Sequence, residues 1–392
     1  MSADPISQHA GPSHGGGAVV ALEHLTKRYG GADAPAVQDL SLRVEAGEIC
    51  VLVGPSGCGK TTTMKMVNRL VEPTSGRVTI DGEDVAALPV VELRRRIGYV
   101  IQQVGLFPHM TVADNVGVVP RLLRWPGPRI RERADELLDL VGLDPRTYGA
   151  RYPSALSGGE RQRVGVARAL AADPPVMLMD EPFGAVDPIR RDRLQNEFLR
   201  LQDQVRKTVV FVTHDVDEAI KMADRIAILQ RGGILAQYDT PDAILAHPAS
   251  EFVERFVGAD RGLKRLSLGR VRDLPLVEAV IVEAGEDRET ARRRLAAINE
   301  LSYALLVDAS NRPLGWIDQT DLAGSGPVDP EAATPGARTV EPETTLRDAL
   351  SAMLDSSVQL GVVVDARDRV LGLISVDAIS EALRAPVTTA ND

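Results

Sequence analysis

Cysteine is scarce in this sequence, which has only Cys50 and Cys58 among its 392 residues. The two do not form a C-x-x-C pair, and Cys58 lies inside a glycine-rich loop that a disulfide would obstruct. This scarcity excludes a disulfide-stapled fold and fits a reducing compartment.

Long apolar runs and an excess of positive charge are also missing. The apolar stretches are a few residues each, far short of the roughly 18 needed to span a bilayer, and no charged-then-apolar signal segment opens the chain. The 45 Lys and Arg against 55 Asp and Glu give a net charge of −10, which disfavours nonspecific binding to nucleic acid or anionic lipid. We therefore expect a cytoplasmic protein whose main activity does not involve nucleic acid.

What is present fits a folded chain of two or three domains, because 44% of the residues are hydrophobic and 26% are charged. Residues 1–17 are rich in Gly, Pro, Ser and His and predict a flexible tail. Apolar runs at 49–53, 176–179 and 209–212, each followed by a helical pattern, predict buried strands of a mainly parallel sheet. This pattern indicates an α/β domain that ends near residue 260.

Beyond residue 261 the sequence matches itself at a spacing of 57 residues, with 303–317 aligning to 360–374. Each copy contains an apolar run ending in Val-Asp-Ala, a polar turn and a second run beginning at Leu-Gly, which predicts a β-hairpin. Helical patterns at 289–298 and 345–354 precede the two hairpins, and a Gly- and Pro-containing linker at 323–336 separates the copies.

A phosphate-binding loop is indicated by the pattern G-x-x-x-x-G-K-S/T between a predicted strand and a predicted helix. Glycines let backbone N–H groups turn toward a triphosphate, Lys60 would neutralise the β and γ phosphates, and the Thr61 hydroxyl would reach Mg²⁺. An ordinary Gly-rich turn is the alternative. The candidate nucleotide-binding residues of the loop are Gly54, Pro55, Ser56, Gly57, Cys58, Gly59, Lys60, Thr61 and Thr62.

Two further motifs follow along the chain. The apolar run 176–179 ends in Asp180 and Glu181, where Asp180 would hold Mg²⁺ and Glu181 would accept a proton from the water that attacks the γ phosphate. Before it, Ser157-Gly158-Gly159-Glu160 opens a helix whose N–H groups and dipole attract phosphate. Alone, the first motif is a common strand end and the second is a helix cap.

The order of these motifs resembles the ABC transporter ATPases over residues 18–260. The resemblance implies that Gln102 is the Q-loop residue, which contacts Mg²⁺ and reports to a membrane partner, and that His214 is the switch histidine at the γ phosphate. It also implies that Asp187 belongs to the D-loop and that Tyr29 stacks on adenine. Glu160 and Val186 depart from the commoner Gln and Leu. The expected catalytic residues are Glu181, His214 and Gln102, and the expected metal ligands are Thr61, Gln102 and Asp180.

Segments 64–70, 98–111 and 179–188 look like the ATPase subunits of bacterial importers for quaternary amines such as glycine betaine, choline or carnitine. The resemblance implies a second copy of the chain that closes around two ATP, membrane permease subunits, and indirectly an extracytoplasmic solute-binding protein. It places the chain peripherally on the cytoplasmic face of the inner membrane. An importer for another solute, such as an amino acid or polyamine, and a soluble ABC ATPase are the alternatives.

The repeat at about 268–385 is similar to tandem CBS motifs. We therefore expect a P-loop ABC ATPase domain at 18–262, with a mainly parallel sheet plus antiparallel β and helical subdomains. An α/β tandem CBS domain at 263–386 and a flexible end at 387–392 would follow. Nucleotide-binding CBS copies end in G-x-x-S/T-x-x-D, but copy one has Asp318 at the hydroxyl position before Asp321, and copy two has Ser375 with Asp377 one residue early.

The role of this repeat stays open at the level of the sequence. It could sense ionic strength, bind an adenine nucleotide, or only dimerise the subunits. A basic cluster, formed by Arg288, Arg292, Arg293 and Arg294, suggests charge contacts with the mate, the permease or anionic lipid that weaken as salt rises.

Overall fold

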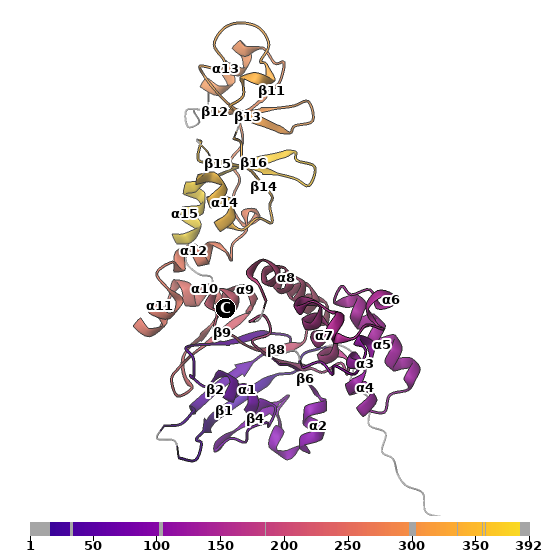
Figure 1. Ribbon diagram of the computed structural model, residues 1–392. Helices are drawn as coiled ribbons and strands as arrows, with labels where there is room; N and C mark the ends of the chain where they lie inside the picture. The colour runs from indigo at the N-terminus through magenta and orange to yellow at the C-terminus, as the bar shows by residue number, and fades with distance from the viewer. Residues whose placement is uncertain are drawn as a thin grey trace, which may run out of the picture. The chain divides into compact units, whose positions relative to one another are not determined.

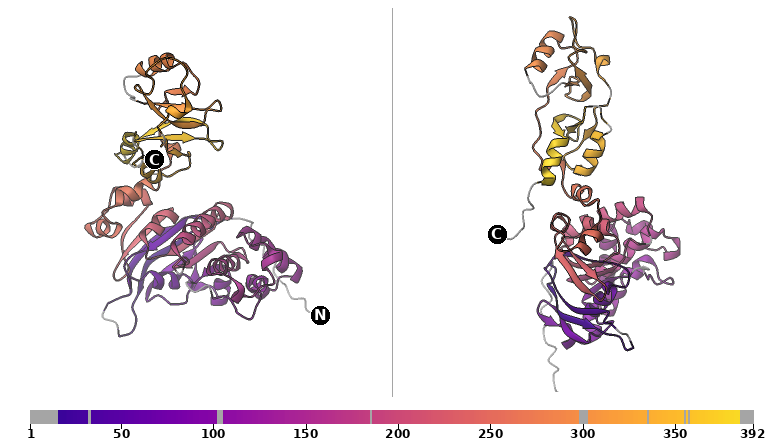
Figure 2. Two further views of the ribbon diagram at one scale, coloured as in Figure 1. Left: turned by 45° about the horizontal axis from the view of Figure 1, so that its top comes forward. Right: turned by 90° about the vertical axis from the view of Figure 1, so that its left-hand side faces the viewer.

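The computed structural model describes residues 16–31, 34–101, 105–184, 186–297, 303–334, 336–354, 356 and 358–384. The chain divides into two compact units (Figures 1 and 2). The first runs to Ile244 and takes in Pro248–Phe256, and the second contains Leu245–His247 and the chain from Val257 onward. Residues 1–15 of the predicted tail and the whole predicted C-terminal end, 387–392, lie outside the described residues.

A six-stranded sheet forms the centre of the first unit. Its order is β10-β9-β3-β8-β7-β6, and all neighbours are parallel except β9 and β10. The strands are β3 (Ile49–Val53), β6 (Ile97–Val100), β7 (Val176–Asp180), β8 (Thr208–Val212), β9 (Arg225–Gln230) and β10 (Ile234–Asp239). Every residue of β3 and β8 is buried, as expected for parallel strands covered on both faces. The three predicted strands are confirmed.

A second, antiparallel sheet of order β2-β1-β4-β5 shares a core with the first. Its strands are β1 (Val20–Lys27), β2 (Val37–Val44), β4 (Ser75–Ile80) and β5 (Glu83–Asp84). Leu25 and Leu40 of this sheet and Leu52 of β3 belong to one cluster and are fully buried. The two sheets therefore stabilise each other through a single apolar interior.

Helices complete the first unit. They are α1 (Lys60–Val67), η1 (Val85–Ala87), α2 (Val90–Arg95), α3 (Val112–Val116), α4 (Val118–Leu122), α5 (Gly127–Leu140), α6 (Pro145–Tyr148), η2 (Pro153–Ala155), α7 (Gly158–Leu170), α8 (Pro188–Val205), α9 (Val216–Met222), α10 (Pro241–Ala246), whose last residues belong to the second unit, and α11 (Glu251–Val257). In α5 the buried residues Ile130, Ala134 and Leu137 recur at helical spacing, which gives the helix one apolar face. The helix expected after Ser157 is confirmed as α7.

The second unit contains two three-stranded sheets with the same topology, β11-β12-β13 and β14-β15-β16. Its elements are α12 (Arg261–Leu266), η3 (Val271–Asp273), β11 (Ile281–Glu283), α13 (Arg288–Ala296), β12 (Tyr303–Val307), β13 (Pro313–Asp318), η4 (Pro330–Ala332), β14 (Thr339–Val340), α14 (Leu346–Leu354), β15 (Leu360–Val364), β16 (Val370–Ser375) and α15 (Val376–Arg384). In each sheet a parallel pair is followed by an antiparallel hairpin. The predicted hairpins are confirmed.

The two hairpins lie side by side and share a core (Figures 1 and 2). Leu305 and Trp316 of the first hairpin belong to the same buried cluster as Val362 and Leu373 of the second. The strands are also joined by a backbone hydrogen bond at their turns, from Val370 N to the carbonyl oxygen of the first copy's turn, 3.0 Å away. The repeats therefore form one folded body.

The segment predicted as a linker, residues 323–336, packs back onto copy one. Arg288 N donates to Gly326 O over 3.0 Å, and Val328 N donates to Glu286 O over 2.8 Å. Thr334 exchanges two backbone hydrogen bonds with Trp316, of 2.8 and 3.1 Å. These bonds make the described part of the predicted linker an extra edge of the first repeat.

Candidate functional site

The glycine-rich loop connects β3 to α1, as the motif requires. Gly54 and Gly59 have φ angles of 155° and 103°, in the region that favours glycine. A Cβ atom on Gly59 would lie 2.4 Å from Ala36 O, and one on Gly54 would lie 2.3 Å from Leu229 O. Since the N-cap of α1 is Gly59, which has no side chain to cap the helix, the first N–H groups of α1 are available to an anion.

Lys60 lies in the loop and is nearly buried, with 7% of its surface exposed. Its Nζ donates to Gly54 O over 2.7 Å and to Pro55 O over 3.2 Å, and it lies 3.7 Å from Cys58 Sγ. The ammonium thus donates to loop carbonyls. Phosphate oxygens are charged and therefore stronger acceptors, so they could replace these carbonyls.

Thr61 and Asp180 bring a hydroxyl and a carboxylate together between α1 and the end of β7. Thr61 Oγ1 donates to Asp180 Oδ1 over 3.3 Å. Burial raises the pKa of Asp180, although the bond from Thr61 opposes this shift. A desolvated carboxylate beside a hydroxyl is a suitable oxygen pair for Mg²⁺, which binds proteins through few carboxylates and completes its shell with phosphate.

Glu181 and His214 face each other at the carboxyl ends of β7 and β8. His214 Nδ1 lies 3.2 Å from Glu181 Oε2, and Glu181 N donates to Val212 O over 2.9 Å. Glu181 has a φ of 44°, a left-handed conformation that costs a non-glycine residue about 1–3 kcal/mol. The backbone bond holds the residue in this strained form, which directs its carboxylate to the histidine.

A cavity of about 590 Å³ collects these groups. Its lining consists of Ala36, Gly54, Pro55, Ser56, Gly57, Cys58, Gly59, Lys60, Thr61, Thr62, Glu181, His214 and Phe256. Thus the whole predicted loop, the proposed base and the histidine meet at one site. Ala36 and Phe256 were not predicted from the sequence, because neither belongs to a motif and both reach the cavity through the fold.

Tyr29 lies on the surface after β1, 45% exposed, and its ring is 5.1 Å from Lys27 Nζ. Among the described residues, the ring is not part of the lining of the loop cavity. Its exposed face leaves room for stacking. Gln102, predicted as a metal ligand and catalytic residue, lies outside the described residues.

Ser157 caps α7, and Glu160 completes a capping box with it. Ser157 N donates to Glu160 Oε2 over 2.6 Å, and Glu160 N donates to Ser157 Oγ over 3.3 Å. Tyr148, on α6, donates from its hydroxyl to Glu160 Oε1 over 2.8 Å. The hydrogen bond from Ser157 N, and to a lesser extent the bond from the Tyr148 hydroxyl, lowers the pKa of Glu160. Gly158 and Gly159 form the first turn of α7, and none of the four motif residues lines the loop cavity of the described chain.

Asp187 caps α8 by accepting a hydrogen bond from Arg190 N over 3.1 Å. One turn further, Arg191 donates to Val186 O over 3.2 Å and lies 3.4 Å from the carboxylate of Asp215, the residue after His214. The segment around Asp187 is therefore tied to the segment that carries the histidine. Sequence motifs did not reveal this link, because it joins two helices distant in the chain.

A groove of about 280 Å³ lies beside β6. Its lining contains Arg94, Arg95, Ile97, Gly98, Tyr99, Ile101, Phe107, Val118, Val119, Arg168, Ala169, Ala172 and Pro174. Phe107 is 40% exposed, and burial raises the pKa of Tyr99 to about 12. The groove thus combines apolar surface with basic side chains.

Comparison with known proteins gives two family matches: the ABC transporter family at residues 37–184 and the CBS domain at 331–385. The chain is 45% identical over 368 residues to the osmoprotectant import ATP-binding protein OsmV of Salmonella typhimurium, covering 93% of this chain and 96% of the relative. The chain belongs to the ATP-binding subunits of ABC transporters for osmoprotectants. Another relative in this family is the glycine betaine/carnitine/choline transport ATP-binding protein OpuCA of Bacillus subtilis, 47% identical over 358 residues, or 90% and 93% of the two chains.

One solved structure similar to this chain contains a bound nucleotide. The ABC cassette MJ0796, dimeric in a post-hydrolysis state with ADP and phosphate, is 34% identical to this chain with a TM-score of 0.51. The match covers 57% of this chain and 98% of the cassette. The predicted fold, an ABC ATPase domain followed by CBS repeats, and the predicted ATPase activity are confirmed. Within the described residues, no helix has the length and apolar content required to cross a membrane.

Proposed function

We propose that this chain hydrolyses ATP to power a membrane permease that imports a quaternary amine of the glycine betaine, choline or carnitine class. The pairing of Glu181 with His214 over the phosphate loop carries the proposal, since it supplies the groups that hydrolysis needs. The names of the relatives support this solute class over an amino acid or a polyamine. A soluble ABC ATPase is the less favoured alternative.

ATP enters the loop cavity, where Lys60 exchanges its loop carbonyls for the β and γ phosphates. Thr61 and Asp180 would hold Mg²⁺ together with Gln102, and the cation would neutralise charge that develops on the phosphate oxygens. The backbone N–H groups at the start of α1 and the residues Gly54–Thr62 surround the triphosphate. Tyr29 stacks on the adenine.

Glu181 is the general base. Its carboxylate accepts a proton from the water that attacks the γ phosphate, a contribution worth about 10²–10⁴ in rate. His214, paired to this carboxylate, contacts the γ phosphate and fixes the orientation of the base. Asp187 communicates with this pair through Arg191 and Asp215.

A second copy of the chain completes the site. The motif from Ser157 to Glu160 does not line the loop cavity of its own described chain, so we assign it to the ATP held by the mate. The free N–H groups of α7 and the Ser157 hydroxyl then contact the γ phosphate opposite Lys60. The dimeric state of the similar cassette supports this arrangement.

The permease binds the groove that contains Tyr99, Phe107 and Arg168. We place the chain on the cytoplasmic face of the inner membrane, with the solute-binding protein on the other side and in indirect contact. The proposed domains are 18–262 for the ATPase and 263–386 for the CBS repeat, between a tail at 1–17 and an end at 387–392.

We assign ionic-strength sensing to the CBS repeat rather than binding of an adenine nucleotide. Asp318 and Asp321, which occupy the ribose positions of copy one, are engaged with each other's backbone: Asp318 N donates to Asp321 Oδ2 over 2.9 Å, and Asp321 N donates to Asp318 Oδ1 over 3.0 Å. In copy two, Ser375 Oγ accepts from Ala378 N over 3.1 Å. The ribose acceptors are thus already used to cap turns. A repeat that only dimerises the chain is the remaining alternative.

The test is transport in vesicles that contain the chain together with its permease. ATP inside and radiolabelled glycine betaine, choline or carnitine outside should give uptake that Glu181→Gln abolishes. Uptake of an amino acid or polyamine, with none of the three amines, would contradict the solute assignment while leaving the ATPase assignment intact. Turnover without any solute uptake would contradict the transport role.

A further inference from the structure

A buried polar contact joins α8 to α9, the helix that follows His214. Gln195 Nε2 on α8 donates to Glu218 Oε1 on α9 over 3.0 Å, and the two residues are 5% and 6% exposed. Carboxylates are almost never buried to this degree unless they are paired or hydrogen-bonded. Neither residue lines the loop cavity of the described chain, and neither belongs to a sequence motif of the site. A role of this pair in hydrolysis must therefore be indirect.

The contacts of Glu218 converge on the turn that carries His214. Thr213 donates its hydroxyl to the Glu218 carboxylate, and Thr213 Oγ1 accepts from Asp215 N over 3.1 Å. Asp215 in turn accepts from Glu218 N over 3.2 Å through Oδ1, which caps α9. The residues on both sides of His214 are thus held by Glu218. The His214 side chain itself is 64% exposed and lies 3.2 Å from Glu181 Oε2, so the direction of the imidazole depends on this turn.

The charge of Glu218 makes these contacts costly to lose. Burial raises the pKa of Glu218, while the hydrogen bonds from Thr213 and Gln195 act in the opposite direction. Asp215 adds a raising effect and Arg191 a lowering one, since their charges act on the same carboxylate. Arg191 lies one turn before Gln195 on α8, 3.4 Å from the Asp215 carboxylate. Two polar contacts one turn apart thus tie α8 to this turn.

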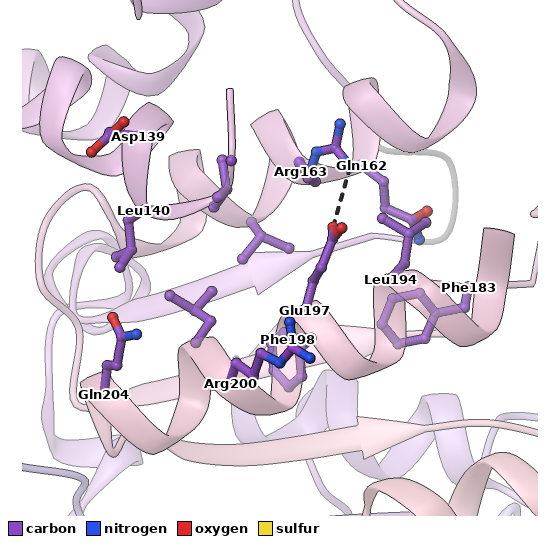
Figure 3. A pocket seen from close by; sticks show the side chains of 14 residues that line it. Asp139, Leu140, Gln162, Arg163, Phe183, Leu194, Glu197, Phe198, Arg200 and Gln204 are labelled. Atoms are coloured by element: carbon purple, nitrogen blue, oxygen red, sulfur yellow. Dashed lines mark hydrogen bonds and ion pairs between the residues drawn. The ribbon is translucent and has the colours of Figure 1, made fainter. Parts of the chain in front are cut away.

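Another side of α8 is fixed to α7 (Figure 3). Arg163 of α7 donates from NH1 to Glu197 Oε2 over 3.2 Å, and Figure 3 shows this bond as a dashed line. Phe198 packs edge-to-face against Phe183, with 6.5 Å between the ring centroids, and both residues are buried. Because these contacts restrain the helix from the side of α7, the Gln195 amide has a firm support.

We propose that Glu218 is a positioning residue for His214. Its carboxylate, supported by Gln195, fixes the turn that directs the imidazole to Glu181 and to the γ phosphate. This assignment depends on the proposed role of His214 in hydrolysis, and it adds a residue that touches neither ATP nor the attacking water. A pair that only stabilises the packing of α8 on α9 is the alternative. The two differ in what happens when stability is restored without the carboxylate.

Replacement of both partners by leucine separates these alternatives. Glu218→Leu and Gln195→Leu each leave one polar group without its partner and should lower the stability of the fold. The double variant replaces a bonded pair by two apolar groups of similar size and should regain most of this stability. Turnover should not return with it. At saturating ATP, in vesicles with the permease, Glu218→Leu and the double variant should hydrolyse ATP about tenfold to hundredfold more slowly than the parent, with about the same KM for ATP.

Asp192→Asn is the matched control, because it removes an exposed contact between the same two helices. Lys221 of α9 pairs with Asp192 of α8, whose side chain is 69% exposed. An exposed ion pair contributes little, so this variant should keep the turnover of the parent.

The ring nitrogen signals of His214 report its position directly. In the full chain labelled with ¹⁵N at histidine, these signals can be assigned by their absence in His214→Ala. They should shift in Glu218→Leu and in the double variant, and they should stay in place in Asp192→Asn. A pair that only stabilises packing would leave them unchanged in a double variant that has regained its stability.

A stable double variant that hydrolyses ATP at the parent rate would overturn the positioning role, and so would unshifted His214 signals in that variant. Where either single variant fails to fold, the double variant alone carries the comparison, because neither member of the pair is left without its partner. Parent turnover in His214→Ala would contradict the role of the histidine and this assignment with it. Inactive His214→Ala beside a fully active double variant would overturn this assignment alone.

Discussion

Replacing Tyr148 with Phe removes a single oxygen atom that holds the motif from Ser157 to Glu160 in place. The Tyr148 hydroxyl donates to one oxygen of Glu160 over 2.8 Å, and the other oxygen of Glu160 accepts from Ser157 N over 2.6 Å. The phenol therefore fixes the carboxylate that in turn fixes Ser157. Tyr148 makes no contact with ATP in this scheme, so we regard it as a positioning residue.

The expected magnitude follows from the character of this bond. A hydrogen bond to a charged group contributes about 1.5–3 kcal/mol when it is well shielded, and Tyr148 and Glu160 are both only half-buried, so we use about 1 kcal/mol. Both motifs of the dimer lose this energy, about 2 kcal/mol in total, so the association constant falls about 30-fold. Because two ATP bind per dimer, half-maximal association then needs about five times more ATP.

The pH dependence of this effect has a definite sign. Hydrogen bonds from Ser157 and then Tyr148 lower the pKa of Glu160, so the charged carboxylate contributes stability above its ordinary pKa, and this contribution is lost as pH falls through the lowered value. Tyr148→Phe returns the pKa toward 4.5. The variant should therefore lose its association at a higher pH than the parent when the solution is acidified.

Sedimentation in a Glu181→Gln background measures this association as MgATP is titrated. Tyr148→Phe should need about five times more ATP for half-maximal dimer, whereas Tyr152→Phe, at an exposed tyrosine nearby, should match the parent. Thermal unfolding of each variant separates positioning from loss of fold. If Tyr148→Phe and Tyr152→Phe dimerise at the same ATP concentration, the positioning role is refuted.

Three further outcomes are expected. Glu181→Gln should keep ATP binding and lose nearly all hydrolysis, since the amide cannot accept the proton. Glu136→Gln, on the surface of α5, is the control, and hydrolysis by Glu181→Gln within threefold of the parent would contradict the base assignment. Lys60→Ala should instead weaken ATP binding itself, as equilibrium dialysis would show, and unchanged affinity would exclude its phosphate contact. Removing residues 263–392 should leave ATPase activity intact and flatten the response of transport to ionic strength; an equally steep response would place the sensor elsewhere.

The sequence predicted those parts of the fold that local pattern determines. Apolar runs bounded by turns located β3, β7 and β8, because strands buried on both faces leave a simple signature. The loop from Gly54 to Thr61 was predictable because phosphate binding dictates both residue type and spacing. The repeat appeared as a self-match, and the structure gives both copies the same strand pairing.

Long-range contacts were not predictable from a single sequence. Phe256 reaches the loop cavity from α11, and the Tyr148 hydroxyl reaches Glu160, which lies on another helix. Phe and Tyr are ordinary residues at these positions, so the hydrophobic pattern of the sequence does not indicate either contact. The packing of the linker 323–336 onto copy one was not predictable, because Gly and Pro mark turns equally in linkers and in segments that fold back. Arg288, expected in a basic cluster that contacts a partner, donates to Pro327 O of its own chain over 3.3 Å.

The charged residues of the second unit differ in whether screening by salt can change their contacts. The pair Arg272–Glu343, 2.6 Å apart, is more than half exposed on both sides and contributes about 1 kcal/mol at most, so its screening changes little. Arg288 and Arg294 donate to backbone carbonyls of their own copy. Arg292 is exposed and has no ion-pair partner in the described part of the chain, which leaves it available for a contact that screening weakens.

Arg292→Glu should therefore shift the internal salt concentration for half-maximal transport in reconstituted vesicles to a lower value, because reversing the charge replaces attraction with repulsion and releases the restraint early. Arg272→Gln combined with Glu343→Gln should leave the midpoint unchanged, since this ion pair joins two residues of the same chain and not the chain to a partner. If truncation abolishes the salt response but Arg292→Glu leaves it unchanged, the restraining contact uses another charged surface of this unit. If neither change affects the salt response, the repeat serves only the association of the chains.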